Sequence, residues 1–308
     1  MPLTARRAVR RMRGGAQAHL LEADNGQFYV VKFQNNPQHR RILVNELLAT
    51  VFLEHLQIAC PSFALIRITQ EFLQKNPEVV MELGSKRISP SPGWHFGSRF
   101  PGDPERVAVY DFLPDALIPQ VANLPDFRGV LVFDKWVGNA DGRQSVYFRV
   151  RLREWLAGPP EAAQIGDAGQ RLCAKAGDHS EDSPLARRSE VHPQRRAFVT
   201  VMIDHGFAFN GPHWDFPESP VQGLYPRKVV YSSVRSLQDF EPWLDQVIHF
   251  PEEVIDRAYR QIPPEWLGDE PGRLEQLLEK LLRRRKRVPD LINDCRRANV
   301  SPFPNWTS

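Results

Sequence analysis

The hydrophobic pattern changes along this chain from strand-like runs to helix-like runs, which restricts the folds that it can adopt. Segment 16–33 predicts a β-hairpin, because the turn signal Asp24-Asn25-Gly26 separates two runs rich in β-forming residues. Pro37 suits the first turn of a helix, and helical periodicity continues to about residue 57. From about residue 235 the sequence is mainly helical. We therefore expect an α+β fold with a β-rich N-lobe and a helical C-lobe.

Further segments mark where these lobes begin and end. Strands are predicted at Phe63 to Thr69 and at Val107 to Phe112, whereas the Pro- and Gly-rich residues 84–105 predict a loop around a short strand. The predicted boundaries are 1–115 for the N-lobe and 116–308 for the C-lobe.

A stretch of low hydrophobicity interrupts the C-lobe. Residues 127–138 predict a buried helix, and the alternation from Ser145 to Leu152 predicts a strand. Residues 157–197 then predict a disordered insert, and an apolar strand follows at 198–203. We predict that the two strands pair with the insert looped out, so that Asp141 and Asp204 face one cleft.

Charge and hydropathy argue against several classes of protein. The net charge is only +3, weaker than a nucleic-acid binder usually carries, so direct nucleic-acid binding is not expected. The mean hydropathy is −0.43, and no run approaches the roughly 18 apolar residues of a membrane helix. No apolar stretch follows the N-terminal arginines, which argues against a secretory signal, and they lead directly into a predicted strand, which argues against a mitochondrial leader.

Two further features fit an ordinary enzyme of a reducing compartment. The basic run Arg283 to Arg287 is more often a solvated helix face than an RNA- or lipid-binding patch. Cys60, Cys173 and Cys295 are widely spaced, which argues against a disulfide framework and a zinc site. We expect a cytoplasmic location.

Three features of the N-terminal part could bind a nucleotide. Gly14, Gly15, Ala16 and Gln17 open the hairpin, where glycines let backbone N–H groups approach phosphates, although paired glycines more often mark an ordinary turn. Lys32 ends a β-branched run and is either a phosphate ligand or a solvent-facing lysine. Glu46 lies among apolar residues on the next helix, so it either pairs with Lys32 or is exposed.

Two aspartates of the C-terminal part could carry phosphate chemistry. Asp141 lies in a polar loop between a buried helix and a strand, where it could orient an acceptor hydroxyl and where Gln144 or Asn139 could assist a metal ion. The alternative for this loop is a simple Asx turn. Asp204 follows a buried strand and precedes His205-Gly206, a position that can hold a metal-binding carboxylate rigidly. His205 is more often structural than catalytic in such a place.

In this order, the motifs resemble those of the phosphoinositide-kinase-like and HipA-like kinases, and most of all the bacterial HipA-like group. The resemblance rests on the segments 14–20, 29–33, 133–141 and 203–209, together with Glu46. It implies a protein-kinase-like fold, ATP and Mg²⁺ as cofactors, and phosphate transfer to a protein Ser/Thr or to a small-molecule hydroxyl. It also implies a partner that resembles an antitoxin.

The resemblance assigns roles to residues of this chain. It implies Asp141 as the catalytic aspartate, Asp204 as a metal ligand, Gly14 to Gln17 as the phosphate loop, and Lys32 with Glu46 as the nucleotide lysine and its partner. The family has a metal-binding asparagine five residues after the catalytic aspartate, where this chain has Val146, so Gln144 is the candidate substitute. The adenine-binding hinge is either His95 to Phe100 or Tyr110 to Leu113.

Three alternatives to a kinase remain open from the sequence. Val146 favours a nucleotide-binding pseudokinase that regulates a partner. Kinase-like folds also include enzymes that transfer AMP, which is the second alternative. The third alternative is a basic nucleic-acid-binding module.

Overall fold

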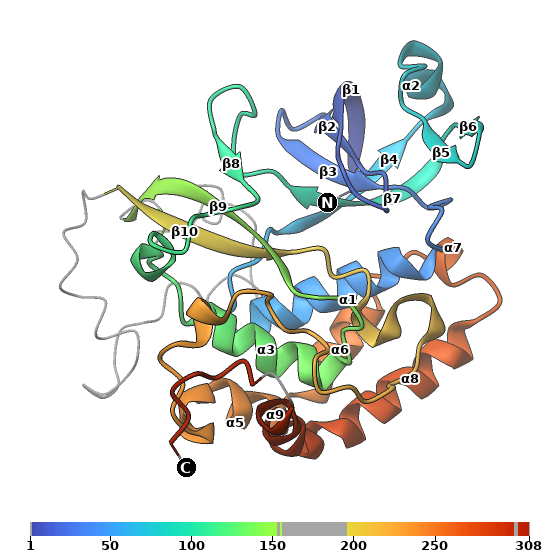
Figure 1. Cartoon of the computed structure of the whole chain (residues 1–308). Helices are drawn as coiled ribbons and strands as arrows, with labels where there is room; N and C mark the ends of the chain where they lie inside the picture. The colour runs from blue at the N-terminus through green and yellow to red at the C-terminus, as the bar shows by residue number, and fades with distance from the viewer. Residues whose placement is uncertain (1, 153–154, 156–195, 299–300, 308) are drawn as a thin grey trace.

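A five-stranded barrel forms the N-terminal part of the protein (Figure 1). The computed structural model describes residues 2–152, 155, 196–298 and 301–307. Around the barrel the strands follow the order β1 (Leu3–Arg11), β2 (His19–Ala23), β3 (Phe28–Lys32), β7 (Gly93–Arg99) and β4 (Phe63–Ile68). Only the pairing of β1 with β4 that closes the barrel is parallel. The predicted hairpin at 16–33 is confirmed as β2 and β3.

The arginine-rich N-terminal segment is the strand β1, which the sequence analysis did not predict. Its arginines are exposed, whereas Ala5 is buried in the barrel core. Arg7 pairs with Glu22 of the neighbouring strand at 2.8 Å, and Arg11 pairs at 2.8 Å with Glu82 of the hairpin formed by β5 (Met81–Leu83) and β6 (Lys86–Ile88). The charges therefore cover the outside of a strand whose other face completes the barrel.

Strand β7 corrects the prediction of a loop with a short strand over residues 84–105. It is seven residues long and lies between β3 and β4. The many Pro and Gly residues made this segment resemble a loop, but a Cβ atom at Gly97 would lie 2.5 Å from Cγ1 of Ile66. The glycine therefore allows close packing inside the barrel.

Replacing Gly97 with alanine should lower the free energy of unfolding by about 1–3 kcal/mol, the usual cost of overpacking a core. Chemical denaturation monitored by circular dichroism would measure this loss. Ser98→Ala, at a half-buried position on the same strand, is the control and should change little. Equal stability of Gly97→Ala and the wild type would contradict this account of β7.

His95 on β7 is fully buried, and its hydrogen bonds fix a neutral ring. Nδ1 accepts the backbone N–H of Gln34 at 2.9 Å, which leaves Nε2–H to donate to the carbonyl oxygen of Ser91 at 3.0 Å. Burial lowers the pKa of His95 to about 4. Protonation of Nδ1 would also place an N–H group of the ring against the backbone N–H of Gln34, which would break that hydrogen bond.

Acidification should therefore destabilise the protein through His95. Between its ordinary pKa of 6.5 and the folded-state pKa of about 4, the unfolded chain binds more protons than the folded one. Stability is then lost as the pH falls, by about 2 kcal/mol between pH 7 and pH 4.5 for this group. Denaturation of the wild type and of His95→Gln at both pH values isolates this contribution. An equal loss in both proteins would contradict it.

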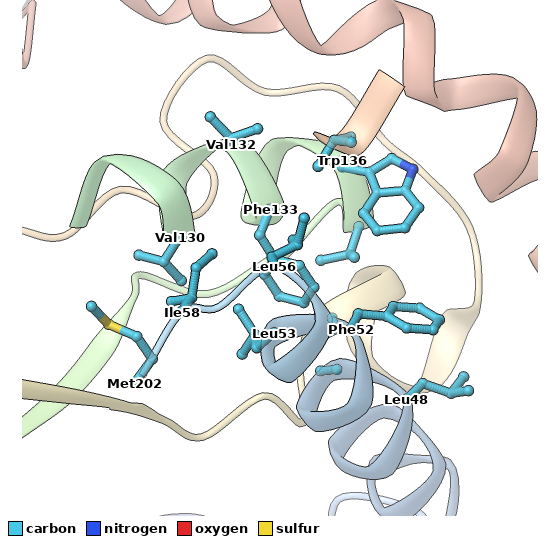
Figure 2. Close-up of a cluster of buried hydrophobic side chains, with 14 of the residues drawn as sticks. Leu48, Phe52, Leu53, Leu56, Ile58, Val130, Val132, Phe133, Trp136 and Met202 are labelled. Carbon is cyan, nitrogen blue, oxygen red and sulfur yellow. The ribbon is translucent and has the colours of Figure 1, made fainter. Parts of the chain in front are cut away.

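Helix α1 (Arg41–His55) is buried on almost all sides, with 13 of its residues inaccessible. Its apolar side chains belong to the large core of the helical part. Figure 2 shows Leu53 of α1 and Leu56, which follows the helix, packed with Val130 and Phe133 of α3 (Asp126–Val137) and with Met202. Helix α1 thus contacts elements of both sequence halves, which makes it a rigid support for side chains near the barrel.

A second sheet confirms the predicted pairing of the two strands around the insert. Strand β9 (Gln144–Arg151) runs antiparallel to β10 (Arg196–Ile203), in a continuous register from Gln144 opposite Ile203 to Arg151 opposite Arg196. Strand β8 is shorter than the predicted strand at 107–112 and spans only Val109–Tyr110. Of the predicted disordered insert 157–197, residues 157–195 lie outside the described residues, and 196–197 begin β10.

The remaining elements are helices and short turns, most of them in the C-terminal part (Figure 1). They are α2 (Gln70–Lys75), η1 (Ile118–Gln120), η4 (Ala208–His213), η5 (Lys228–Tyr231), η6 (Leu237–Phe240), α5 (Trp243–Ile248), α6 (Glu252–Tyr259), α7 (Pro264–Leu267), α8 (Pro271–Arg284), η7 (Arg285–Arg287) and α9 (Val288–Arg297). Among the described residues, no helix is both long and apolar enough to cross a membrane.

The basic run at the end of α8 contacts the protein itself. Arg284 donates to the last carbonyl groups of α3 and pairs with Glu218 at 3.1 Å. Arg287 pairs with the same carboxylate at 3.0 Å, and Arg285 donates to the carbonyl oxygen of Phe250. Arg283, Lys286 and Arg287 are exposed, as predicted for a solvated helix face, whereas Arg284 and Arg285 are half-buried and stabilise helix ends and tertiary contacts.

Candidate functional site

Three predicted site residues meet at the end of β3. Lys32 is the last residue of this strand and is 8% exposed. Its Nζ atom bonds to Oε1 of Glu46 on α1 and lies 2.7 Å from Oδ1 of Asp204, which follows β10. The solvent-facing alternative for Lys32 and the exposed alternative for Glu46 are therefore both wrong.

The charges of these three groups are strongly coupled. Burial alone would lower the pKa of Lys32, but the carboxylates of Glu46 and Asp204 outweigh it and raise the pKa above its ordinary value. Burial raises the pKa of Glu46 despite the lysine. Burial also acts to raise the pKa of Asp204, but Lys32 and Arg143 more than offset it and lower that pKa. A cationic lysine therefore lies beside an ionised aspartate whose side chain is still 35% exposed.

The loop at Gly14 to Gln17 keeps backbone donors free. The N–H of Met12 donates to the carbonyl oxygen of Ala18 at 2.8 Å, and the N–H of Gln17 donates to that of Gly14 at 3.1 Å. Within the part of the chain that the structure describes, the N–H groups of Gly14, Gly15 and Ala16 have no protein acceptor. Gly14 has a φ of 116°, which favours glycine. These free donors suit an anion.

Gln17 and Asn36 fasten this loop to its surroundings. The Gln17 side chain accepts from the N–H of Glu82 and donates to the carbonyl oxygen of Glu82, both at 2.6 Å. The buried Asn36 donates to the carbonyl oxygen of Ala16 at 3.1 Å. Gln17 thus shapes the loop with its side chain, and the sequence analysis missed Asn36.

Asp141 lies in an exposed loop that follows α3. Gly138 ends the helix in the left-handed conformation, with φ 60° and ψ 51°. Oδ1 of Asp141 accepts the N–H of Gly142 at 2.8 Å, and Oδ2 accepts from Nε2 of Gln144 at 3.3 Å. Asp141 and Gln144 therefore contact each other. Gln144 lies opposite Ile203 in the strand register, next to Asp204 in the chain.

A buried ionic network lies beneath this loop, and the sequence analysis did not predict it. Arg143 is fully inaccessible, and it bonds Asp134 through both Nε and Nη2. Its Nη1 contacts Nδ1 of His205 at 2.9 Å and the carbonyl oxygen of Ile203 at 3.1 Å. Burial lowers the pKa of His205 well below its ordinary value, which agrees with a structural histidine. Asn139 donates to Asp134 at 3.0 Å, so its side chain is occupied in this network.

The donor groups fit a hard cation that is bound partly by phosphate. Among the residues described, no group of three or more His, Cys, Asp or Glu side chains could hold a metal alone. Mg²⁺ commonly uses only one or two carboxylates together with substrate phosphates, a role for which Asp204 is suitably exposed. Val146 packs against the apolar cluster of Phe148, Val199 and Val201, so it contributes no ligand.

Comparisons with known proteins support a kinase relationship. The family model described as HipA-like kinase matches residues 6–147. The predicted resemblance is thereby confirmed over a range that contains Lys32, Glu46 and Asp141 but not Asp204. No curated protein matches the sequence.

Solved structures with a similar fold have low sequence identity to this chain. A Fam20 protein from hydra, determined with a sugar, is 14% identical with a TM-score of 0.51, and the match covers 96% of this chain and 87% of that chain. A Golgi casein kinase is 13% identical with a TM-score of 0.49, and the match covers 96% and 73%. The match to the hydra protein confirms a mixed α/β, kinase-like fold.

Proposed function

We propose that this protein is an ATP-dependent phosphotransferase that transfers the γ-phosphate of MgATP to a protein Ser/Thr or a small-molecule hydroxyl. The main support is the buried contact of Lys32 with Glu46 and Asp204, which joins a barrel strand, a core helix and the end of β10. A cationic lysine that two carboxylates hold in place at the end of a barrel strand can bind the negatively charged phosphates of a nucleotide. The proposal includes two lobes, 1–115 and 116–308, with the nucleotide bound between them.

The side chains have separate roles in this proposal. Lys32 binds the phosphates and Glu46 holds it in place, while the free N–H groups of Gly14, Gly15 and Ala16 bind phosphate oxygens and Gln17 holds that loop. Asp141 accepts a hydrogen bond from the acceptor hydroxyl and orients it. Asp204 is the principal metal ligand, and Gln144 is the second candidate. When bound, Mg²⁺ neutralises charge on the phosphates.

A nucleotide-binding regulator without transfer is the second candidate. Two observations favour it: Val146 occupies the position of the expected asparagine ligand, and Lys32 already occupies one oxygen of Asp204. Transfer of AMP is the third candidate, because some proteins with kinase-like folds transfer AMP instead of phosphate. An antitoxin-like partner and a cytoplasmic location belong to the proposal through the family resemblance and the lone cysteines.

Labelling separates these functions. The protein is incubated with MgATP labelled at the γ-phosphate, and in parallel at the α-phosphate, with and without a mixture of candidate acceptor proteins. The kinase proposal expects the γ label on the protein itself or on an acceptor. Incorporation of the α label alone would establish AMP transfer. Nucleotide binding without incorporation of either label would support the regulator.

A further inference from the structure

Asn45, directly before Glu46 on α1, has an unusual set of contacts. It is fully buried, and its Nδ2 lies 2.7 Å from the carbonyl oxygen of Gly206, 2.9 Å from that of Ala208 and 3.0 Å from that of Gly211. Its Oδ1 accepts from Nε1 of Trp214 at 2.9 Å. One side chain therefore contacts four groups of the segment 206–214, which follows Asp204, and its two N–H hydrogens are shared among three carbonyl oxygens.

This segment needs such a partner because its backbone is folded in an irregular way. Asp204, Phe209, Asn210 and Trp214 all have φ between 56° and 58°, the left-handed region that non-glycine residues seldom adopt. Leaving buried acceptors without a donor costs about 1–3 kcal/mol each.

Two more contacts attach the same segment to α1. The guanidinium group of Arg41 lies 4.4 Å from the ring of Trp214, donates to the carbonyl oxygen of Pro212, and binds Glu270 through two nitrogens at 2.6 and 3.0 Å. A Cβ atom on Gly206 would lie 2.6 Å from Cγ2 of Ile42, so backbone and helix are in close contact. Asn45 lies at the centre of this interface.

We propose that Asn45 is a positioning residue that fixes Asp204 relative to the Lys32–Glu46 pair. Glu46 belongs to α1, and Asp204 directly precedes the segment that Asn45 binds. The side-chain amide of Asn45 therefore fixes the positions of the two carboxylates on either side of Lys32. The inference rests on the proposed function, because it assigns Asn45 to the metal-dependent binding of ATP. Asn45 would thus contribute to the proposed site without contacting the nucleotide or the metal ion.

The test measures how Mg²⁺ changes the affinity for a non-hydrolysable ATP analogue, by calorimetry on the full chain. Asn45→Ala should raise the Mg²⁺ concentration for half-maximal tight binding by about tenfold or more, as loss of a supporting hydrogen bond behind a metal ligand commonly does. Its affinity for the analogue in EDTA should stay within about twofold of the wild type, because Lys32 and the glycine loop are unchanged.

The control is Thr50→Val on the same helix. Thr50 is 1% exposed and donates to the carbonyl oxygen of Glu46 at 2.8 Å, so its loss also removes a buried hydrogen bond of α1 but none to segment 206–214. It should leave the Mg²⁺ requirement unchanged. An equal Mg²⁺ requirement in Asn45→Ala and Thr50→Val would overturn the inference.

A second variant decides the matter if Asn45→Ala does not fold. Trp214→Phe removes the donor to Oδ1 together with part of the buried indole ring and keeps an aromatic ring beside Arg41, so the Mg²⁺ requirement should rise by at least about fivefold, the value of one hydrogen bond. No change would overturn the inference. Failure of the proposed function gives a different result, since the wild type itself would then not bind the analogue with Mg²⁺.

Discussion

Replacing Asp204 with alanine should abolish the Mg²⁺-dependent part of ATP binding. We expect the affinity for MgATP to fall by about 100-fold, because losing a charged partner in a partly buried site costs about 3 kcal/mol. The folded structure should persist, because Lys32 keeps its ion pair with Glu46. Calorimetry with MgATP measures the total affinity, and calorimetry with ATP in EDTA measures the part that does not depend on Mg²⁺.

The control for this variant is Asp215→Ala. Asp215 is an exposed residue directly after segment 206–214, and its carboxylate accepts a hydrogen bond from Nδ2 of Asn210 at 2.6 Å. Its loss should leave MgATP binding unchanged. If Asp204→Ala retained wild-type affinity in the presence of Mg²⁺, the assignment of Asp204 as a metal ligand would be wrong.

Replacing Asp141 with asparagine should remove phosphate transfer and leave nucleotide binding intact. The carboxylate is exposed, and among the described residues it accepts hydrogen bonds only from Gly142 and Gln144, so the substitution disturbs no buried group. Loss of a group that orients and accepts the proton of the acceptor hydroxyl should slow transfer by about 10²- to 10⁴-fold. Affinity for MgATP should change by less than about twofold. Transfer is followed with the γ-labelled nucleotide, and binding by calorimetry.

Asp256→Asn provides the matched substitution at an exposed position of α6, remote in sequence from the loop. It should transfer phosphate at the wild-type rate. Wild-type transfer by Asp141→Asn would mean that another group orients the acceptor. A parallel loss of binding and transfer would instead assign Asp141 to the nucleotide site.

The sequence predicted those elements whose signals are local. Turn residues and alternating apolar runs located the hairpin of β2 and β3, the helix α3 and the pairing of β9 with β10. Strand β1 was missed because its exposed arginines dominate the pattern. Strand β7 was predicted only as a short strand within a loop, because Gly97 is a packing requirement set by Ile66, which lies on a different strand.

The same distinction applies to the candidate site. Lys32, Glu46 and Asp204 were predicted from motifs, and the structure brings their charged atoms together. Asn45 and Arg143 were missed because they have partners far away in the sequence: Asn45 binds the backbone of Gly206, and Arg143 binds His205 and the carbonyl oxygen of Ile203. A polar residue within the apolar run of α1 was the one local signal for Asn45, and it indicates burial with partners without identifying them.

The most direct test of the account is a crystal structure with Mg²⁺ and a non-hydrolysable ATP analogue. The account predicts that the metal is bound by Asp204, that Lys32 contacts the phosphates while keeping Glu46, and that the N–H groups of Gly14, Gly15 and Ala16 donate to phosphate oxygens. Asp141 should lie close to the γ-phosphate. A nucleotide bound elsewhere, or one bound here with Lys32 and Asp204 contacting neither phosphate nor metal, would contradict the central claim.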